Sequence, residues 1–289
     1  MTFREALTHG FSQLYASPRL RNEALQDAVY LLLHSLAITR ASLIADYDRV
    51  LTGDQLAAYQ GLISRRLTNE PIQYITGERE FYGLPMRVTP AVLIPRNSTE
   101  HVVEAVLEEL KAEAQAEPKA GPLRIADVGT GCGAIAIALA YHLPDARVLA
   151  LDVSSEALEV AAANAQLNHV AERVRCLESD VLSGVAGEAA FDAIVCNPPY
   201  IPTVERDSLH PQIRDFEPEV SLYGGPAGLD FYRRLVPEAL AALKPNGLLA
   251  LEIGRGQRDA VAELLAEWNQ VRFVDDLQQI PRVVLARRP

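Results

Sequence analysis

The chain has 289 residues, of which 49% are hydrophobic and 22% are charged. This composition indicates one large or two ordinary globular domains, and it excludes a largely disordered chain. The net charge of −11 argues against avid nonspecific binding to nucleic acid, because an acidic surface repels phosphates.

Apolar runs in this sequence are too short to cross a membrane, and the first residues lack the pattern of a signal peptide. The three cysteines are scattered and form no C-x-x-C pair: Cys132, Cys176 and Cys196. We therefore expect a cytoplasmic protein with reduced thiols and without a metal site.

The first part of the chain, residues 1–70, is predicted to be helical. Apolar residues at helical spacing predict a helix over Glu23–Ile38, with Asn22 as its N-cap. Thr52 and Gln55 have the spacing of a capping box at the start of another helix. A plain helical bundle and a docking domain for a macromolecular substrate both fit this pattern.

Residues 71–95 interleave apolar and aromatic side chains with glycine and proline, which predicts short strands that form a hairpin. This hairpin is expected to link two domains. Ser98 is expected to cap a helix that runs to about Ala116.

Strand and helix patterns alternate from Leu123 onward. The predicted strands are Leu123–Val128, Arg147–Val153, Val174–Leu177, Phe191–Cys196, Gly247–Ile253, Val271–Asp275 and Arg282–Ala286. The predicted helices are Ala134–His142, Ser155–Leu167 (with Ser154 as N-cap), Leu229–Leu243 and Gln257–Trp268. Such alternation indicates an α/β fold with parallel strands and helices on both faces of the sheet. The last two strands lie too close in sequence for a helix between them and should form an antiparallel hairpin.

A glycine-rich loop follows the first of these strands, and its residues are Asp127, Val128, Gly129, Thr130, Gly131, Cys132 and Gly133. Glycines allow a tight turn and a close approach to a ligand, and the helix behind the loop favours a negatively charged group. The loop also satisfies a loose dinucleotide fingerprint, and a purely structural turn fits it as well.

Two aspartates end the next two strands. Asp152 lies about 20 residues beyond the loop, a spacing that suits a carboxylate accepting hydrogen bonds from ribose hydroxyls. Asp180 could accept from an adenine amine, although an exposed aspartate at a strand end is common. Asp152 could equally help to start the helix that follows it.

The most informative segment is Asn197-Pro198-Pro199-Tyr200, which ends the fourth strand. The two prolines stiffen the turn, because neither has an N–H group for a strand ladder. An amide side chain, unpaired carbonyls and an aromatic ring can together hold a flat NH₂ group. These four sites meet at the carboxyl edge of the sheet, where ligands bind in such folds. A proline turn with an incidental tyrosine is the plain alternative.

These motifs resemble those of class I S-adenosylmethionine-dependent N-methyltransferases, and over nearly the whole chain the sequence is similar to the PrmC/HemK family. The further matching segments are residues 70–83, Leu93-Ile94-Pro95-Arg96 with Thr99-Glu100, Phe216-Glu217-Pro218, and Gly224-Gly225 with Gly228-Leu229-Asp230. Residues 97 and 98 depart from the family, which usually has a proline and an acidic residue there.

The resemblance implies a Rossmann-like catalytic domain over 96–289, with a mostly parallel seven-stranded sheet and a C-terminal antiparallel hairpin. A hairpin linker over 71–95 and a small helical substrate-docking domain over 1–70 would precede it. The implied reaction methylates the side-chain amide nitrogen (N5) of glutamine in the Gly-Gly-Gln motif of class 1 peptide chain release factors. S-adenosyl-L-methionine would be the donor and S-adenosyl-L-homocysteine the product, and we expect a monomer.

By the same resemblance, the Gly129–Gly133 loop would hold the methionine part of the cofactor, and Asp127 would also belong to the cofactor site. Asp152 would bind the ribose, and Asp180 with Val181 would contact the adenine. Asn197 and Pro198 would accept the two hydrogens of the substrate amide, and Tyr200 would hold the amide plane. Pro199 would also belong to the substrate-binding segment, and Asn197 would contact the cofactor as well. The long segment Ile201–Gly228 would form a wall or lid over the glutamine.

Three other functions are compatible with parts of this pattern. An adenine or cytosine N-methyltransferase would use the same tetrapeptide on a base amine, but the acidic chain lacks a basic, aromatic-rich domain. An NAD-dependent oxidoreductase would explain the glycine loop and leave Asn197 to Tyr200 unexplained. An inert cofactor-binding regulator would retain all motifs without turnover.

Overall fold

The computed structural model describes residues 1–116, 121–185, 191–276 and 278–289. Contacts divide the chain into two compact units. Unit 1 comprises Met1–Gly77 with His210–Phe216, and unit 2 comprises Glu78–Leu209 with Glu217–Pro289. Residues 71–77 were expected to belong to a hairpin, and they instead include a short helix, α5 (Ile72–Thr76). Gly77 ends this helix in the left-handed region (φ 77°), so the hairpin begins only at Glu78.

Unit 1 consists of helices, and those from α1 to α5 contribute apolar residues to one core. Besides α5, they are α1 (Phe3–Ala16), α2 (Ala24–Leu36), α3 (Arg40–Ala45), α4 (Gly53–Leu67) and the single turn α9 (Pro211–Arg214). The predicted capping box of Thr52 and Gln55 is present at the start of α4. The predicted cap at Asn22 was wrong, because α2 begins one residue later, after Glu23, and receives no side-chain cap.

Two buried contacts hold these helices together. A Cβ atom at Gly10 in α1 would lie 2.2 Å from the Tyr59 hydroxyl of α4, so only glycine permits this approach. Arg66 of α4 is 1% exposed, and its guanidinium donates to Asp27 at 2.7 Å and to Glu23 at 3.1 Å. Removal of Arg66 would leave the buried Asp27 carboxylate without its cationic partner, so this pair helps to fix how α2 and α4 pack.

Unit 2 contains a seven-stranded sheet in the order β5-β4-β3-β6-β7-β9-β8. Its strands are β3 (Arg124–Val128), β4 (Arg147–Asp152), β5 (Val174–Glu178), β6 (Phe191–Cys196), β7 (Leu243–Glu252), β8 (Asn269–Asp275) and β9 (Pro281–Arg287). The five strands from β3 to β7 are parallel, and β9 runs antiparallel to both β7 and β8. The mostly parallel sheet and the terminal hairpin are therefore confirmed.

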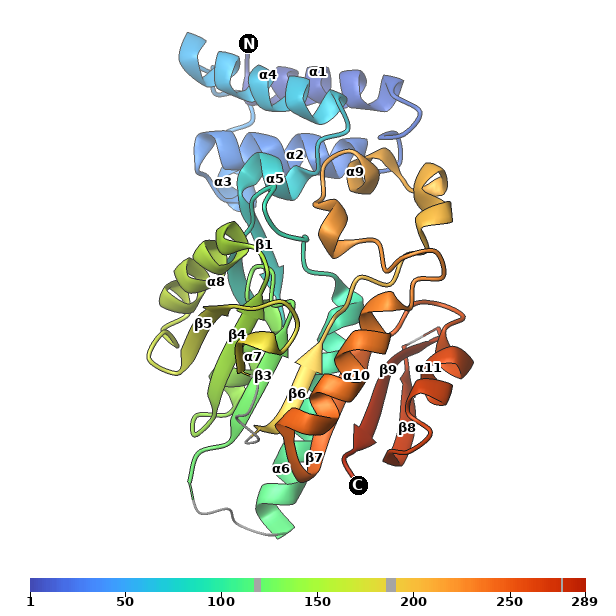
Figure 1. Cartoon of the computed structure of the whole chain (residues 1–289). Coiled ribbons are helices and arrows are strands. Elements are labelled where there is room, and N and C mark those ends of the chain that lie inside the picture. The colour runs from blue at the N-terminus through green and yellow to red at the C-terminus, as the bar shows by residue number, and fades with distance from the viewer. Residues whose placement is uncertain (117–120, 186–190, 277) are drawn as a thin grey trace. The chain divides into compact units, whose positions relative to one another are not determined.

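Helices cover both faces of this sheet, with α10 in front of it and α6 behind it in Figure 1. The helices are α6 (Asn97–Ala116), α7 (Ala134–His142), α8 (Ser155–Leu167), α10 (Asp230–Ala242) and α11 (Arg258–Leu264), with short 3₁₀ turns at Ser183–Val185, Thr203–Ser208 and Glu219–Ser221. Ser154 caps α8 as predicted, since its hydroxyl accepts from the Ala157 N–H. Ser98 does not cap α6, because it lies within the first turn of that helix.

A two-stranded hairpin, β1 (Glu78–Phe81) and β2 (Leu84–Arg87), precedes the sheet. Its turn residues, Tyr82 and Gly83, both have positive φ, as a tight hairpin turn requires. The fully buried amide of Asn164 in α8 accepts from the Arg87 N–H at 2.7 Å and donates to the Arg87 and Cys132 carbonyls. The hairpin is thus attached to the loop that follows β3.

Candidate active site

The site lies at the carboxyl edge of the parallel strands. The register aligns four strand residues across this edge: Val128, Leu151, Cys196 and Leu251. The chemically important residues come directly after these four in sequence: Gly129, Asp152, Asn197 and Glu252. Four segments far apart in sequence therefore converge on one small region.

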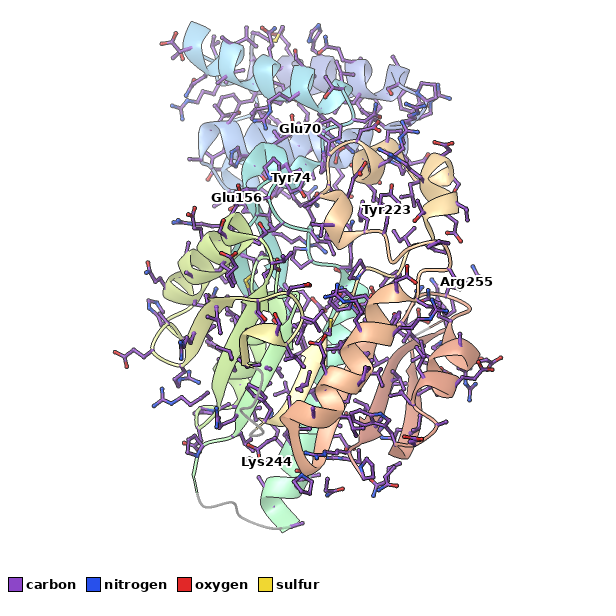
Figure 2. The ribbon with its side chains drawn as sticks, in the orientation of Figure 1. Glu70, Tyr74, Glu156, Tyr223, Lys244 and Arg255 are labelled. Carbon is purple, nitrogen blue, oxygen red and sulfur yellow. The ribbon has the colours of Figure 1, made fainter. Side chains whose placement is uncertain are left out.

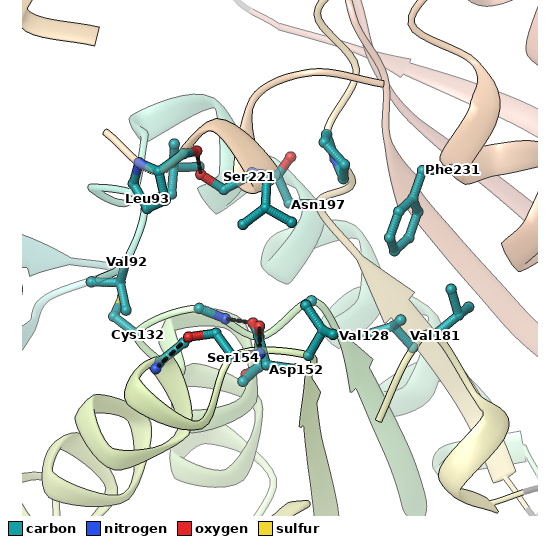
Figure 3. A pocket seen from close by; sticks show the side chains of 18 of the residues that line it. Val92, Leu93, Val128, Cys132, Asp152, Ser154, Val181, Asn197, Ser221 and Phe231 are labelled. Atoms are coloured by element: carbon teal, nitrogen blue, oxygen red, sulfur yellow. Dashed lines mark hydrogen bonds between the residues drawn. The ribbon is translucent and has the colours of Figure 1, made fainter. Parts of the chain in front are cut away.

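A cavity of about 800 Å³ opens over this edge, and every described lining residue belongs to unit 2. Figure 3 shows Asp152 and Ser154 on one side of it and Asn197 and Phe231 on the other. The predicted site residues that line it are Gly129, Thr130, Gly131, Cys132, Asp152, Asp180, Val181, Asn197 and Pro199. Those that do not are Asp127, Gly133, Pro198 and Tyr200.

The glycine loop forms an open cradle. Gly129 and Gly131 have φ values of 69° and 55°, and no atom lies within 4 Å of where a Cβ would stand on either. The space beside them is therefore available to a ligand that approaches the backbone closely.

Asp127 and Gly133 support the loop from beneath. Asp127 is fully buried, and one of its oxygens accepts from the Thr130 hydroxyl at 2.6 Å and from the Ala136 N–H at 3.0 Å. Burial raises the pKa of Asp127 to about 7, against these hydrogen bonds, which lower it. A Cβ at Gly133 would lie 2.9 Å from Ile137 and 3.1 Å from Ala161, so this glycine permits close packing of α7 on α8.

Asp152 is held as an acceptor at the cavity edge. One carboxylate oxygen accepts from the Gly131 N–H at 2.8 Å and the other from the Ser154 N–H at 3.0 Å. Each oxygen retains a further lone pair for a ligand hydroxyl. The plain alternative, a role in starting α8, is compatible with the bond to Ser154, since one carboxylate serves both purposes.

Asp180 lines the cavity next to Val181, and it forms an ion pair with Arg234 of α10 at 2.7 Å. Both side chains are at least half exposed, so the pair contributes little to stability. The pairing leaves other acceptor positions on the Asp180 carboxylate.

The Asn-Pro-Pro-Tyr segment contributes Asn197 and Pro199 to the cavity lining. Asn197 is half-buried, and its Nδ2 donates to the Thr99 hydroxyl at 3.0 Å. Tyr200 points elsewhere, and its hydroxyl donates to the Glu252 carboxylate at 3.2 Å. Burial, followed by the negative charge of Glu252, raises the pKa of Tyr200 well above its ordinary value. Among the described residues, the carbonyl oxygen of Pro198 receives no hydrogen bond.

The backbone of this segment is fixed by glycines and by one amide. A Cβ at Gly224 would lie 2.4 Å from the Pro199 carbonyl oxygen, and one at Gly228 would lie 2.2 Å from that of Tyr200. Gln257 donates from Nε2 to the carbonyls of Tyr200 at 2.9 Å and Gly228 at 3.1 Å. Gly224 and Gly228 therefore allow the backbone to pack closely against Pro199 and Tyr200.

The long segment Ile201–Gly228 forms part of the cavity wall. Its two ends are joined by backbone bonds from Ile201 to Leu222, from Gly224 to Ile201 and from Thr203 to Gly225. Its lining residues are Pro218, Val220, Ser221, Tyr223, Gly224 and Gly225. Figure 2 shows Tyr223 on this segment, at the opposite end of unit 2 from Lys244 in β7.

Sequence reasoning missed several residues of the site. Apolar contacts come from Val92, Leu93 and Phe231. The buried Glu217 accepts from Arg96 at 2.5 Å and from the Ile94 N–H at 3.4 Å, which anchors the Leu93–Arg96 stretch. Thr99 and Glu252 were also missed. Glu252 could have been found, because it is a charged residue at the end of the apolar strand β7.

Family models match both parts of the chain. Residues 103–210 match the Methyltransferase small domain, and residues 5–77 match the PrmC N-terminal domain. A release factor glutamine methyltransferase of Koribacter versatilis (strain Ellin345) is 43% identical over 293 residues, which cover 100% of this chain and 99% of the relative. Another release factor glutamine methyltransferase, from Moorella thermoacetica, is 46% identical over 268 residues, which cover 91% of this chain and 89% of the relative.

Solved structures agree on the fold. The catalytic domain of hMettl16 in complex with an RNA hairpin has a TM-score of 0.58 at 14% identity and covers 89% of this chain and 90% of that one. A T. thermophilus 16S rRNA methyltransferase (RsmC) in complex with AdoMet and guanosine has a TM-score of 0.53 at 21% identity, covering 73% and 50%. At these identities the likeness shows the fold alone.

The fold is that of a class I methyltransferase. The two relatives named above are more than 40% identical to this chain over most of their length. The chain therefore belongs to the release factor glutamine methyltransferase family. Within the part of the chain that the structure describes, no helix is both long and apolar enough to span a bilayer.

Proposed function

We propose that this protein transfers a methyl group from S-adenosyl-L-methionine to the side-chain amide nitrogen of glutamine in the Gly-Gly-Gln motif of class 1 peptide chain release factors. The observation that carries the proposal is that Asn197 faces the same cavity as Asp152 and the glycine cradle. The names of the full-length relatives support this choice of substrate.

The residues present fit the cofactor. The cavity lies within the usual size range for small-molecule sites, and its floor has the open space beside Gly129 and Gly131. Asp152 would accept from the ribose hydroxyls, while Asp180 and Val181 would contact the adenine. S-adenosyl-L-methionine supplies an electrophilic methyl group on a sulfonium, and S-adenosyl-L-homocysteine remains after transfer.

Asn197 and Pro198 would orient the glutamine. An amide nitrogen is a weak nucleophile, because its lone pair is delocalised into the carbonyl. The Asn197 Oδ1 and the Pro198 carbonyl would accept its two hydrogens and aim the nitrogen at the methyl carbon. Positioning of this kind and fixed dipoles supply most of the rate enhancement in such a reaction. No strong base is required, because the proton can leave after transfer.

Tyr200 would act less directly than the sequence suggested. Its hydroxyl is bonded to Glu252 and the residue packs against the core of unit 2, so it would brace the turn that carries Asn197. Pro199, which lines the cavity, would form the wall beside the substrate amide.

Unit 1 would bind the body of the release factor. It exposes apolar side chains that its core does not use, among them Leu25 and Ile44, each 58% exposed. A release factor acts on ribosomes, so we expect the enzyme in the cytoplasm. We also expect a monomer that binds no nucleic acid directly, given its net charge of −11.

The test is mass spectrometry of a class 1 release factor after incubation with the protein and S-adenosyl-L-methionine. One added methyl group on the glutamine of Gly-Gly-Gln is expected, and none on a variant with that glutamine changed to glutamate. Methylation of DNA or RNA under the same conditions, with none on the release factor, would instead support the base N-methyltransferase.

A further inference from the structure

Glu252 is a buried carboxylate that the reaction above does not use directly. It ends β7 with 0% exposure, directly beside the end of β6 that carries Asn197. Such a group is costly to bury unless its oxygens are bonded. Three hydroxyls meet this need, from Ser98 at 3.1 Å, Thr99 at 2.6 Å and Tyr200 at 3.2 Å.

Thr99 connects this carboxylate to the cavity. Its hydroxyl lies 2.6 Å from Glu252 and 3.0 Å from Asn197 Nδ2, and Thr99 itself lines the cavity. Burial raises the pKa of Glu252, but the Thr99 hydroxyl is the donor of this bond and gives its single proton to Glu252 Oε2. The Thr99 oxygen can then only accept from Asn197, and it can do so only from the NH₂ side of that amide.

We infer that Glu252 is a positioning residue that acts through Thr99 to fix which way the Asn197 amide faces. The NH₂ group is held against Thr99, and Oδ1 is presented to the cavity as an acceptor. A flipped Asn197 would present its NH₂ to the substrate NH₂, where two donors meet and no hydrogen bond forms. This inference rests on the proposed function, since it assigns the atom that receives the substrate amide.

The same carboxylate holds a second part of the segment. Tyr200 donates to the Glu252 oxygen that Ser98 also contacts, so both ends of the Asn197–Tyr200 turn are bonded to one network. The main chain of Glu252 is itself held, because the buried Tyr232 hydroxyl donates to its carbonyl at 2.9 Å. Ser98 occupies a position where the family usually has an acidic residue, and here it adds a third donor.

The chain offers a matched set of variants. Thr99→Val keeps the shape and removes the hydroxyl, whereas Thr99→Ser keeps the hydroxyl. Ser98→Ala removes a donor to the same carboxylate, while the Ser98 side chain neither bonds to Asn197 nor lines the cavity. Glu252→Gln is a supporting variant, because its NH₂ could donate to Thr99 and free the threonine proton for Asn197 Oδ1.

The first readout is the rate of methyl transfer in a single turnover. We expect Thr99→Val to lower it about tenfold to a hundredfold, as for the loss of a supporting group. Thr99→Ser should recover most of that loss, and Ser98→Ala should stay within about threefold of the wild type. The affinity for S-adenosyl-L-homocysteine, measured by calorimetry, should remain within about twofold in all three. A Thr99→Val enzyme with the wild-type rate would overturn the inference.

The second readout needs no substrate. In ¹⁵N spectra, the Asn197 side-chain NH₂ signals, assigned by their loss in Asn197→Asp, should shift and exchange faster in Thr99→Val than in Ser98→Ala. Unchanged signals would overturn the inference even if activity fell. If the wild type fails to methylate a release factor while these signals respond as expected, the substrate assignment is wrong and the positioning network stands.

Discussion

At the scale of single residues, the site depends on where polar groups are held. Asp152 has both oxygens bonded to backbone N–H groups, which places its remaining lone pairs at the cavity edge. The Asn197 side chain is held by a bond from its Nδ2 to the Thr99 hydroxyl. Side chains with fixed bonds behind them keep their orientation when a ligand arrives, which is the basis of preorganised binding.

Asp152→Ala should weaken cofactor binding. The variant removes the acceptor proposed for the ribose hydroxyls, and hydrogen bonds to a charged group contribute about 1.5–3 kcal/mol each. We expect the affinity for S-adenosyl-L-homocysteine, measured by calorimetry, to fall at least about tenfold. An affinity equal to that of the wild type would contradict the ribose role.

Asp127 should make stability depend on pH. Its pKa is raised by burial to about 7 from an ordinary value of 3.8. Between these values the folded protein retains a proton that the unfolded chain has released, so the free energy of unfolding falls as the pH rises through this window. Burial also raises the pKa of Asp27, Glu217 and Glu252, so Asp127→Asn should reduce this slope rather than abolish it. The variant should gain up to about 4 kcal/mol relative to the wild type between pH 4 and pH 8.

Urea denaturation at pH 5 and at pH 8 measures this difference. Asp180→Asn, which removes an exposed carboxylate, is the control and should keep the slope of the wild type. The same slope in Asp127→Asn would show that this carboxyl is not protonated in the folded protein.

At the scale of elements, the strands and helices of unit 2 follow from local patterns. The apolar run of β6 and the helix α7 have the predicted bounds, and Ser154 caps α8 as expected. Residues 71–77 were assigned wrongly, because their aromatic and apolar content suits a strand while packing in unit 1 favours a helix. Tertiary contacts decide such short segments.

The site was predictable only in part, for a related reason. The glycine loop, Asp152 and Asn197 are visible because each directly follows a recognisable strand. Thr99 and Glu252 are separated by about 150 positions in sequence, and their contact depends on how α6 packs against β7. Gly133 and Tyr200 belong to visible motifs, but the sequence does not reveal that one serves packing and the other bonds to Glu252.

The close contact at Gly228 should be sensitive to a single added methyl group. Gly228 has φ 72°, and a Cβ there would lie 2.2 Å from the Tyr200 carbonyl oxygen. We expect Gly228→Ala to cost about 2 kcal/mol or more in unfolding free energy and to lower methyl transfer at least about tenfold. Denaturation and single-turnover kinetics measure the two effects.

Gly77→Ala is the matched control for this variant. Gly77 has φ 77°, but no atom lies within 4 Å of its Cβ position. Its substitution should add only backbone strain, about 1–2 kcal/mol, and leave the rate unchanged. Equal rates in the two variants would show that the contact between Gly228 and Tyr200 does not position Asn197.

At the scale of the whole molecule, one unit carries the cavity and the other exposes apolar side chains. We expect the double variant Leu25→Ser, Ile44→Ser to raise the KM for a release factor about fivefold or more, as the loss of contact residues does. The KM for a short Gly-Gly-Gln peptide and the cofactor affinity should not change. A larger KM for the peptide as well would indicate that the variant disturbs unit 2 rather than a docking surface.

The whole account depends on Asn197 as the group that receives the substrate amide at the cavity. The most direct test is Asn197→Ala, with methyl transfer to a release factor and the affinity for S-adenosyl-L-homocysteine measured on the same preparation. We predict a rate at least about a hundredfold lower than that of the wild type, with a cofactor affinity that is largely unchanged. Turnover at the wild-type rate would contradict the account.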